Sequence, residues 1–350
     1  MDLEDLGFNI NLEKFRTDNN LNINNIGRVI AVHKERFIVK TVTGEFEAEI
    51  TGNMRFTAKS FIDFPTVGDW VSMIIYDSDF AIIHSIFPRF SLIKRQSVGR
   101  HGEVQLIAAN VNYAFLVQSA ERDFNLNRLE RYLTICNSSG IVPIALLTKI
   151  DLISEDRLSA VTDSISRRMK NLPVYAISNE TRNGYEAIKN LMENGKTYCM
   201  LGSSGVGKST LLNNLYGRAV MRTDEISHST NKGKHVTSHR ELVVLEEGGI
   251  LIDNPGMREV GIADDNEGLE LTFDLIIKLS ENCKFINCTH TVEAGCSVLD
   301  ALERDELESS YYENYLKMQK EKAYFESTLE ERRKKDKIFG KMFKNYKKGK

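Results

Sequence analysis

The chain has 350 residues, of which 41% are hydrophobic and 27% are charged, and its formal net charge at pH 7 is −3. This composition is ordinary for a globular protein and leaves room for roughly two or three domains. No hydrophobic run approaches the ~20 residues of a membrane-spanning helix, and the acidic start "MDLEDLGF" does not resemble a secretory signal. We therefore expect a cytoplasmic protein without a membrane partner.

The first third of the chain is expected to be β-rich. Residues 1–20 are polar, and we expect a loose extension there. Between residues 26 and 90, short β-rich runs alternate with turn residues, which is typical of a small barrel or sandwich. A five-stranded oligonucleotide-binding (OB) barrel fits the length of this segment. The pattern does not distinguish a nucleic-acid-binding barrel from one with only a structural role.

The pattern of hydrophobic residues changes after the basic stretch at 93–103. Strand-like and helix-like runs alternate, which predicts a parallel sheet covered by helices on both faces. Strands are expected at 104–118, 141–149, 172–178 and 196–201, helices at 125–140, 154–169, 184–192 and 209–217, and a hairpin at 239–253. From about residue 264 the pattern is helical and acidic, and the chain ends in a basic segment.

The stretch "GSSGVGKST" matches the phosphate-loop pattern G-x-x-x-x-G-K-[ST]. Glycines let backbone N–H groups surround phosphate oxygens, and the helix that follows adds its positive end. Lys208 would reach the β and γ phosphates, and the Ser209 hydroxyl would bind Mg²⁺. The residues expected around the phosphates are Gly202, Ser203, Ser204, Gly205, Val206, Gly207, Lys208, Ser209 and Thr210. The loop alone fits ATP as well as GTP.

A candidate base-reading element precedes this loop in the chain, where Thr148, Lys149 and Asp151 follow a strand-like run. A carboxylate there can accept hydrogen bonds from the N1–H and the 2-amino group of guanine, whereas adenine offers no such pair. Lys149 can lay its stem along the base. At the end of the next strand, Ser178 and Asn179 are expected to support the base edge through their loop backbone. A solvent-exposed Lys–Asp pair is the alternative explanation of this motif.

Two further elements follow the phosphate loop. "DNPG" places Asp253 and Gly256 in a D-x-x-G pattern, in which the carboxylate holds Mg²⁺ and the glycine amide senses the γ phosphate. Residues 228–241 form the expected switch, where Thr237, or Ser238 as second choice, completes the Mg²⁺ shell. The parts of a GTPase are therefore present in a cyclically rearranged order. Such an order is physically reasonable because domain termini often lie close together.

Cys283, Cys288, His290 and Cys296 form the pattern C-x₄-C-x-H-x₅-C. Three thiolates and an imidazole can close a tetrahedral Zn²⁺ shell with no open position, which predicts one structural zinc ion. Buried apolar thiols are the alternative explanation. They account poorly for three of the five cysteines and a histidine within fourteen residues.

This arrangement resembles the circularly permuted GTPases, and within them the ribosome-small-subunit-dependent GTPase A family. The resemblance covers about residues 24–300, and its most specific part is the D-x-P-G element followed by the cysteine cluster. It implies an N-terminal OB barrel with a flexible extension (1–97), a permuted α/β P-loop GTPase domain (98–262), and a helical zinc-binding subdomain with a basic tail (263–350). It also implies GTP or GDP with Mg²⁺, one zinc ion, and the small ribosomal subunit and its rRNA as partners of a monomer.

Hydrolysis needs a group that orients the attacking water. Ras-like enzymes use a glutamine just after D-x-x-G, but this chain has Met257 there, so we expect slow intrinsic turnover. The resemblance points instead to His235, whose neutral imidazole can accept a hydrogen bond from a water molecule. The predicted activity is GTP hydrolysis that the small subunit stimulates late in its assembly.

Alternatives remain open for the activity and for the tail. The protein could be an RNA-binding GTP switch with negligible turnover, or an ATP-dependent P-loop enzyme that does not depend on Asp151. The last twenty residues hold ten Lys or Arg against two acids. This segment can bind RNA, lie on an anionic membrane or pack on the protein, and the neighbouring barrel and zinc subdomain favour RNA.

Overall fold

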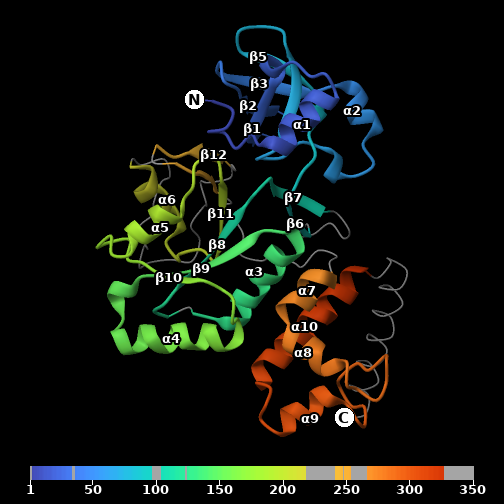
Figure 1. Cartoon of the computed structure of the whole chain (residues 1–350), viewed down its shortest axis with the longest axis vertical. Coiled ribbons are helices and arrows are strands. Elements are labelled where there is room, and N and C mark those ends of the chain that lie inside the picture. Colours follow the sequence, from blue (N-terminus) through green and yellow to red (C-terminus); the bar gives the residue numbers. More distant parts are fainter. Residues whose placement is uncertain are drawn as a thin grey trace, which may run out of the picture.

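The computed structural model describes residues 2–33, 36–96, 104–122, 124–217, 241–246, 248–253 and 266–326. Three parts follow one another along the longest axis of the molecule (Figure 1). The β-rich N-terminal part lies at one end, an α/β part lies in the middle, and the C-terminal helices lie at the other end. No helix among the described residues is long and hydrophobic enough to cross a membrane.

The N-terminal part is the predicted five-stranded barrel. Its strands are β1 (Ile26–His33), β2 (Arg36–Lys40), β3 (Glu45–Ile50), β4 (Trp70–Ile75) and β5 (Phe80–Ile86). They pair in the order β1-β2-β3-β5-β4, and β4 returns to pair with β1, so the barrel closes. Alternate residues of each strand face a buried core that includes Val39, Val71 and Ile83. The short helix α2 (Gly52–Thr57) connects β3 to β4.

The N-terminal residues are not loose, so that prediction is wrong for residues 2–20. Asn9 caps helix α1 (Ile10–Asp18), and Leu3, Leu6 and Leu12 pack with Trp70 of the barrel in a small core. The segment is mostly polar, and its few leucines show no regular spacing. Their spacing is irregular because some of them contact the barrel from a turn and others from a helix. Burial of these side chains therefore outweighs the polar character of the segment.

Buried Arg28 ties the N-terminal segment to the barrel and to the α/β part. Its guanidinium donates to the carbonyl oxygens of Leu6 at 2.6 Å, Gly68 at 3.1 Å and Asn110 at 3.1 Å. Burial lowers the pKa of Arg28 to about 9, which leaves it charged at neutral pH. These three carbonyl contacts hold the first residues of the chain against the rest of the molecule.

The middle part is built on parallel strands in the order β10-β9-β8-β11-β13, with the antiparallel strand β12 beside β13. The strands are β8 (Tyr113–Ser119), β9 (Val142–Thr148), β10 (Val174–Ala176), β11 (Thr197–Gly202), β12 (Glu241–Val244) and β13 (Ile250–Asp253). Helices α3 (Leu126–Ser139) and α4 (Glu155–Arg168) pack on one face. Helices α5 (Tyr185–Leu191) and α6 (Lys208–Tyr216) pack on the other. The predicted parallel sheet and its hairpin are thus confirmed.

One predicted strand is wrong in extent. The run at 104–118 forms two strands, β7 (Val104–Ala109) and β8, and β7 pairs with β6 (Leu92–Gln96) in a separate hairpin. The extended strand is interrupted at Asn110, which has a φ of 56°. The side chain of Asn110 donates a hydrogen bond to the carbonyl of Gly68. Since apolar residues continue on both sides of Asn110, hydrophobicity alone gives no sign of this break.

The C-terminal part is helical, as predicted. It contains α7 (Asn266–Thr272), α8 (Asp274–Ser280), α9 (Ser297–Glu303) and α10 (Ser309–Glu326) around a core that includes Phe273, Ile276 and Tyr315. Helix α7 lies against α3 at Gly268, where an added Cβ would come within 1.9 Å of the Ser138 hydroxyl oxygen. A side chain at residue 268 would therefore push the C-terminal helices away from the α/β part.

Candidate nucleotide site and metal cluster

The strand order brings the predicted nucleotide residues to one edge of the sheet. In the parallel register Thr148 lies opposite Ser119, and Gly202 lies opposite Val117. Residues 178–179 follow β10, which pairs with β9 up to Ala176. The base-reading element, the phosphate loop and the 178–179 loop therefore follow the carboxyl ends of β9, β11 and β10, which lie along the same edge of the sheet. Open α/β sheets bind ligands at this edge.

The phosphate loop joins the buried strand β11 to helix α6. Gly205 and Gly207 have φ values of 79° and 93°, conformations that favour glycine. An added Cβ at Gly207 would lie 2.5 Å from the side-chain nitrogen of Asn179. The ammonium group of Lys208 lies within the loop, 2.8 Å from the carbonyl oxygen of Gly202 and 2.6 Å from that of Ser203. Ser209 and Thr210 follow Lys208 in the first turn of α6.

Thr148 connects the base-reading element to the phosphate loop. Its side chain is buried, and its hydroxyl donates to the carbonyl of Val206 at 2.7 Å. The sequence predicts that Thr148 contacts guanine, but this hydroxyl is used to hold the loop. Lys149 has a left-handed φ of 59°, and the carboxylate of Asp151 is exposed in the short turn Ile150–Leu152. Asp151 is therefore accessible to a base at the edge of the sheet.

Ser178 and Asn179 shape the adjoining loop through their side chains. The Ser178 hydroxyl accepts backbone N–H bonds from Glu180 and Thr181, which fixes the turn. The Asn179 amide donates to the carbonyl of Gly207 at 3.0 Å. From the sequence, both residues are expected to support the base through their backbone, and the contact of the Asn179 side chain with the phosphate loop is not predicted. An asparagine in a polar loop carries no sign of such a distant partner.

Several predicted site residues lie outside the described residues. These are His235, Thr237, Ser238 and Gly256, together with the side chain of Asp253. The backbone of Asp253 ends β13, opposite Glu241 of β12. The roles assigned to these residues remain predictions.

The four predicted zinc ligands come together in the C-terminal part. Their ligand atoms all lie within 4.8 Å of one another. The Sγ of Cys283 is 3.9 Å from that of Cys296, and the Nδ1 of His290 is 3.6 Å and 3.4 Å from these two sulfurs. With usual Zn–S and Zn–N bond lengths, a tetrahedral site has S···S edges of ~3.8 Å and S···N edges of ~3.6 Å. The donor set therefore fits a zinc ion in both chemistry and spacing.

Two side chains outside the ligand set hold the cluster in shape, and sequence analysis did not identify them. The carboxylate of Glu293 accepts hydrogen bonds from Thr289 at 2.8 Å and 2.5 Å and from the backbone N–H groups of Thr291 and Val292. The Tyr312 hydroxyl, on α10, donates to the carbonyl of His290 at 2.5 Å. Glu293 thus fixes the loop that carries His290, and Tyr312 anchors this loop to the longest C-terminal helix.

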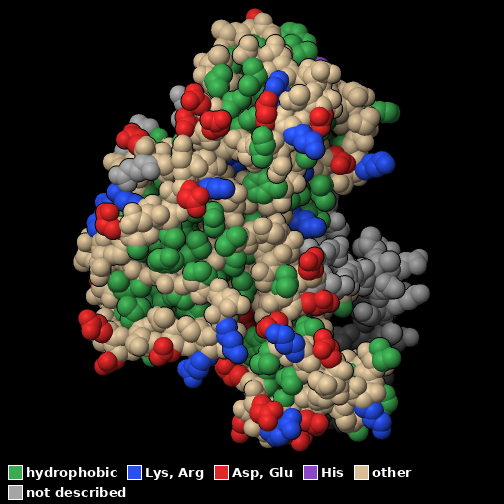
Figure 2. All heavy atoms as spheres, in the orientation of Figure 1, with side chains coloured by type: hydrophobic (Ala, Val, Ile, Leu, Met, Phe, Trp, Pro, Cys, Tyr) green, Lys and Arg blue, Asp and Glu red, His purple; other side chains and the backbone are tan. Residues whose placement is uncertain are grey.

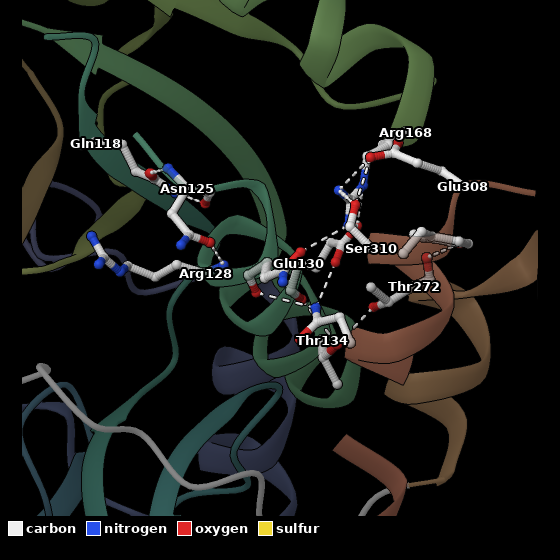
Figure 3. A network of polar contacts seen from close by, with 12 residues as sticks. Gln118, Asn125, Arg128, Glu130, Thr134, Arg168, Thr272, Glu308 and Ser310 are labelled. Atoms are coloured by element: carbon white, nitrogen blue, oxygen red, sulfur yellow. Dashed lines mark hydrogen bonds and ion pairs between the residues drawn. The ribbon is translucent and has the colours of Figure 1, made fainter. Parts of the chain in front are cut away.

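A buried polar network joins the C-terminal helices to the α/β part (Figure 3). Glu130 of α3 is fully buried, and its carboxylate pairs with Arg168 of α4 at 2.7 Å and accepts from Asn314 of α10 at 2.5 Å. Arg168 also contacts Ser310 and Glu308. Charged side chains of both signs gather where these two parts meet (Figure 2). Helices α3 and α4 therefore supply an ion pair, Glu130 with Arg168, to which Asn314 and Ser310 of α10 are hydrogen-bonded.

A second set of contacts fixes α7 and α10 on α3. The hydroxyl of Thr272 accepts hydrogen bonds from Thr134 and Asn137, both at 3.0 Å. Arg131 and Glu321 form a two-pronged ion pair with distances of 2.7 Å and 2.6 Å. Such bidentate pairs also fix orientation. In the sequence, residues 254–265 separate the end of β13 from the start of α7.

Glu130 makes the junction sensitive to pH. Burial raises its pKa from an ordinary value of 4.5 to about 7, although Arg168 and Asn314 oppose the shift. Because the folded protein holds this proton more tightly than the unfolded chain, the stabilisation is complete below pH 4.5 and is lost as pH rises through about 7. We expect this loss to reach about 3 kcal/mol. Thermal unfolding between pH 5 and pH 8 tests this, because the Glu130→Gln variant should not show this loss of stability as the pH rises. If the stability of the variant falls with pH as steeply as that of the unmodified protein, Glu130 is not the group responsible.

Comparisons with known proteins agree with this architecture. The family model of the RsgA GTPase matches residues 86–263. The small ribosomal subunit biogenesis GTPase RsgA 2 of Listeria monocytogenes serotype 4b (strain F2365) is 43% identical over 85% of this chain and 84% of its own length. RsgA 1 of Oceanobacillus iheyensis is 39% identical over 91% of this chain and 93% of its own length.

Solved structures show the same permuted fold. YjeQ from Thermotoga maritima superposes with a TM-score of 0.61 and 25% identity, covering 84% of this chain and 96% of that protein. YloQ, described as a circularly permuted GTPase, has the same TM-score and identity and covers 87% of this chain and 96% of its own. The rearranged order of the nucleotide elements in this chain agrees with the description of YloQ. On the family match and the identity to its relatives, the chain belongs to the RsgA GTPase family.

Proposed function

We propose that this GTPase acts in assembly of the small ribosomal subunit and hydrolyses GTP when docked on that particle. The observation that supports GTP binding is the hydrogen bond from Thr148 to the carbonyl of Val206. This bond joins the candidate base-reading element to the phosphate loop at one edge of the sheet. The names of the relatives, small ribosomal subunit biogenesis GTPases, support the choice of partner. The protein is taken to be a cytoplasmic monomer.

The proposed roles follow from the residue types and their positions. Lys208 and the amides of residues 202–210 bind the phosphates, and Ser209, Asp253 and Thr237 bind Mg²⁺. Asp151 and Lys149 read guanine, and Gly256 senses the γ phosphate. Ser178 and Asn179 shape the loop beside the base, and Thr148 holds the phosphate loop in register with the base reader. His235 orients the attacking water.

The cysteine cluster is proposed to hold one structural zinc ion. Cys283, Cys288, His290 and Cys296 would supply all four ligands, so no position is left for a reacting water molecule. The barrel, this metal-bound part and the basic segment at 331–350 are proposed to contact rRNA. The last of these lies outside the described residues.

The test is GTP hydrolysis by the purified protein, measured alone, with small ribosomal subunits and with large ones. We expect slow turnover alone and a rise of at least about a hundredfold with small subunits only, because stimulating groups supplied to a GTPase act on that scale. His235→Ala should abolish the rise while leaving GTP binding intact. Turnover that stays flat with every particle would overturn the partner and favour a GTP-binding switch with negligible hydrolysis.

A further inference from the structure

A chain of hydrogen bonds runs from helix α6 through α5 to the phosphate loop. The side-chain amide of Asn214 donates to the Tyr185 hydroxyl at 2.8 Å, and this hydroxyl donates to the Oδ1 of Asn179 at 2.7 Å. The Nδ2 of Asn179 then donates to the carbonyl of Gly207 at 3.0 Å. The second N–H of the Asn214 amide is bonded to the backbone carbonyl of Asn179 at 3.0 Å. Both N–H groups of the Asn214 amide and the Tyr185 hydroxyl therefore have defined acceptors.

The chain of bonds has a fixed direction. Because Tyr185 donates to Oδ1, the Asn179 amide must turn its nitrogen toward Gly207. The opposite orientation would set two oxygens against each other. Burial raises the pKa of Tyr185 above its ordinary value, so the hydroxyl keeps its proton over the neutral range. Arg182 covers the Tyr185 ring, with its guanidinium carbon 5.4 Å from the ring centre. The tyrosine is thus held in place from both sides.

This series of hydrogen bonds ends at the peptide that links Gly207 to Lys208. A trans peptide is planar, and its carbonyl points opposite to the N–H of the next residue. The Gly207 carbonyl is bonded to Asn179 and also accepts the N–H of Leu211 at 2.9 Å, the first bond of α6. Fixing this carbonyl therefore directs the N–H of Lys208 back toward the loop, where donors to a phosphate must converge.

We propose that Asn214, Tyr185 and Asn179 form a relay that positions the Gly207–Lys208 peptide for the nucleotide phosphates. The inference rests on the proposed phosphate role of this loop and assigns a positioning role to side chains that need not touch the nucleotide. Tyr185 acts only through Asn179. Because GTP and GDP share the phosphates nearest the loop, losing the relay weakens the binding of both nucleotides.

The test compares two tyrosines whose buried hydroxyls both make hydrogen bonds. Tyr185→Phe breaks the relay. Tyr198→Phe removes a hydroxyl that donates to Leu191 at 2.6 Å and accepts from Glu193 at 3.1 Å. Dissociation of a fluorescent GDP is followed by stopped flow in the full chain. We expect dissociation about fivefold faster for Tyr185→Phe and unchanged for Tyr198→Phe, with similar losses in melting temperature.

A double-variant cycle separates positioning from general loosening. Asn179→Ala should accelerate GDP release at least as much as Tyr185→Phe, and adding Tyr185→Phe to Asn179→Ala should have no further effect. Independent effects of the two substitutions, or equal acceleration by Tyr198→Phe, would overturn the relay. Lys208→Ala tests the proposed function separately. If that variant retains GDP, the phosphate site itself is wrong, whatever the tyrosine variants do.

Discussion

Replacing Asp151 with asparagine is expected to weaken GTP binding by about a hundredfold and to improve binding of xanthosine triphosphate. The carboxylate can accept from both the N1–H and the 2-amino group of guanine. An asparagine amide instead sets a donor against that amino group, and one or two charge-assisted bonds worth about 1.5–3 kcal/mol each are lost. Xanthine carries a carbonyl oxygen where guanine has the amino group, so the same amide can donate to it. The base preference should therefore change with one substitution.

The measurement is competitive displacement of a fluorescent GDP by GTP, xanthosine triphosphate and ATP. Asp156→Asn provides the matched control, since Asp156 is an exposed aspartate in the first turn of α4, and it should leave the order GTP over the other two unchanged. If Asp151→Asn keeps full affinity for GTP, guanine is not read by this residue.

Removing the proposed zinc ion is expected to unfold the loops between α8 and α9 and to loosen the C-terminal helices. Zinc binding supplies on the order of 10 kcal/mol of apparent free energy in small structural sites. The cluster residues Cys283, Cys288 and Cys296 pack directly against the core of this part. Without the ion, three thiols and an imidazole would be left together with only weak contacts to one another.

Metal content and hydrogen exchange test this directly. The purified chain should contain one zinc ion, and Cys288→Ala should lose it together with amide protection in α8 and α9. Cys136→Ala is the control, because Cys136 is a fully buried cysteine of α3 far from the cluster in sequence. It should lower stability while the zinc content stays the same. A zinc-free chain with full protection in α8 and α9 would show that the cluster is only a packed set of thiols.

The sequence predicts those parts of the site that contiguous residues build. The phosphate loop needs glycines, a lysine and a hydroxyl at fixed spacing, and the metal cluster needs its sulfur and nitrogen atoms on short loops. Each of these two sites can therefore be predicted from a short stretch of consecutive residues. The alternation of strands and helices predicts the parallel sheet for the same reason, because each crossover unit carries its own hydrophobic periods.

The parts that sequence reasoning missed depend on distant partners. Asn179 is an ordinary loop asparagine until the fold brings Gly207 beside it. Glu130 looks like a surface residue of a helix until Arg168 and Asn314 enclose it. The break at Asn110 depends on Gly68 of the barrel. No local pattern encodes these pairs, since each partner lies on a different element.

The pairing of β12 with β1 has a further consequence for solubility. Ala31 of the barrel pairs with Glu241, so the sheet of the α/β part continues into the barrel through what would otherwise be its open edge. An unpaired edge strand offers free N–H and C=O groups to other chains and invites aggregation. The opposite edge is formed by the three-residue strand β10, which is too short to serve as much of a template. At Glu241 the barrel thus occupies backbone groups of β12 that would otherwise be open to pairing with another chain.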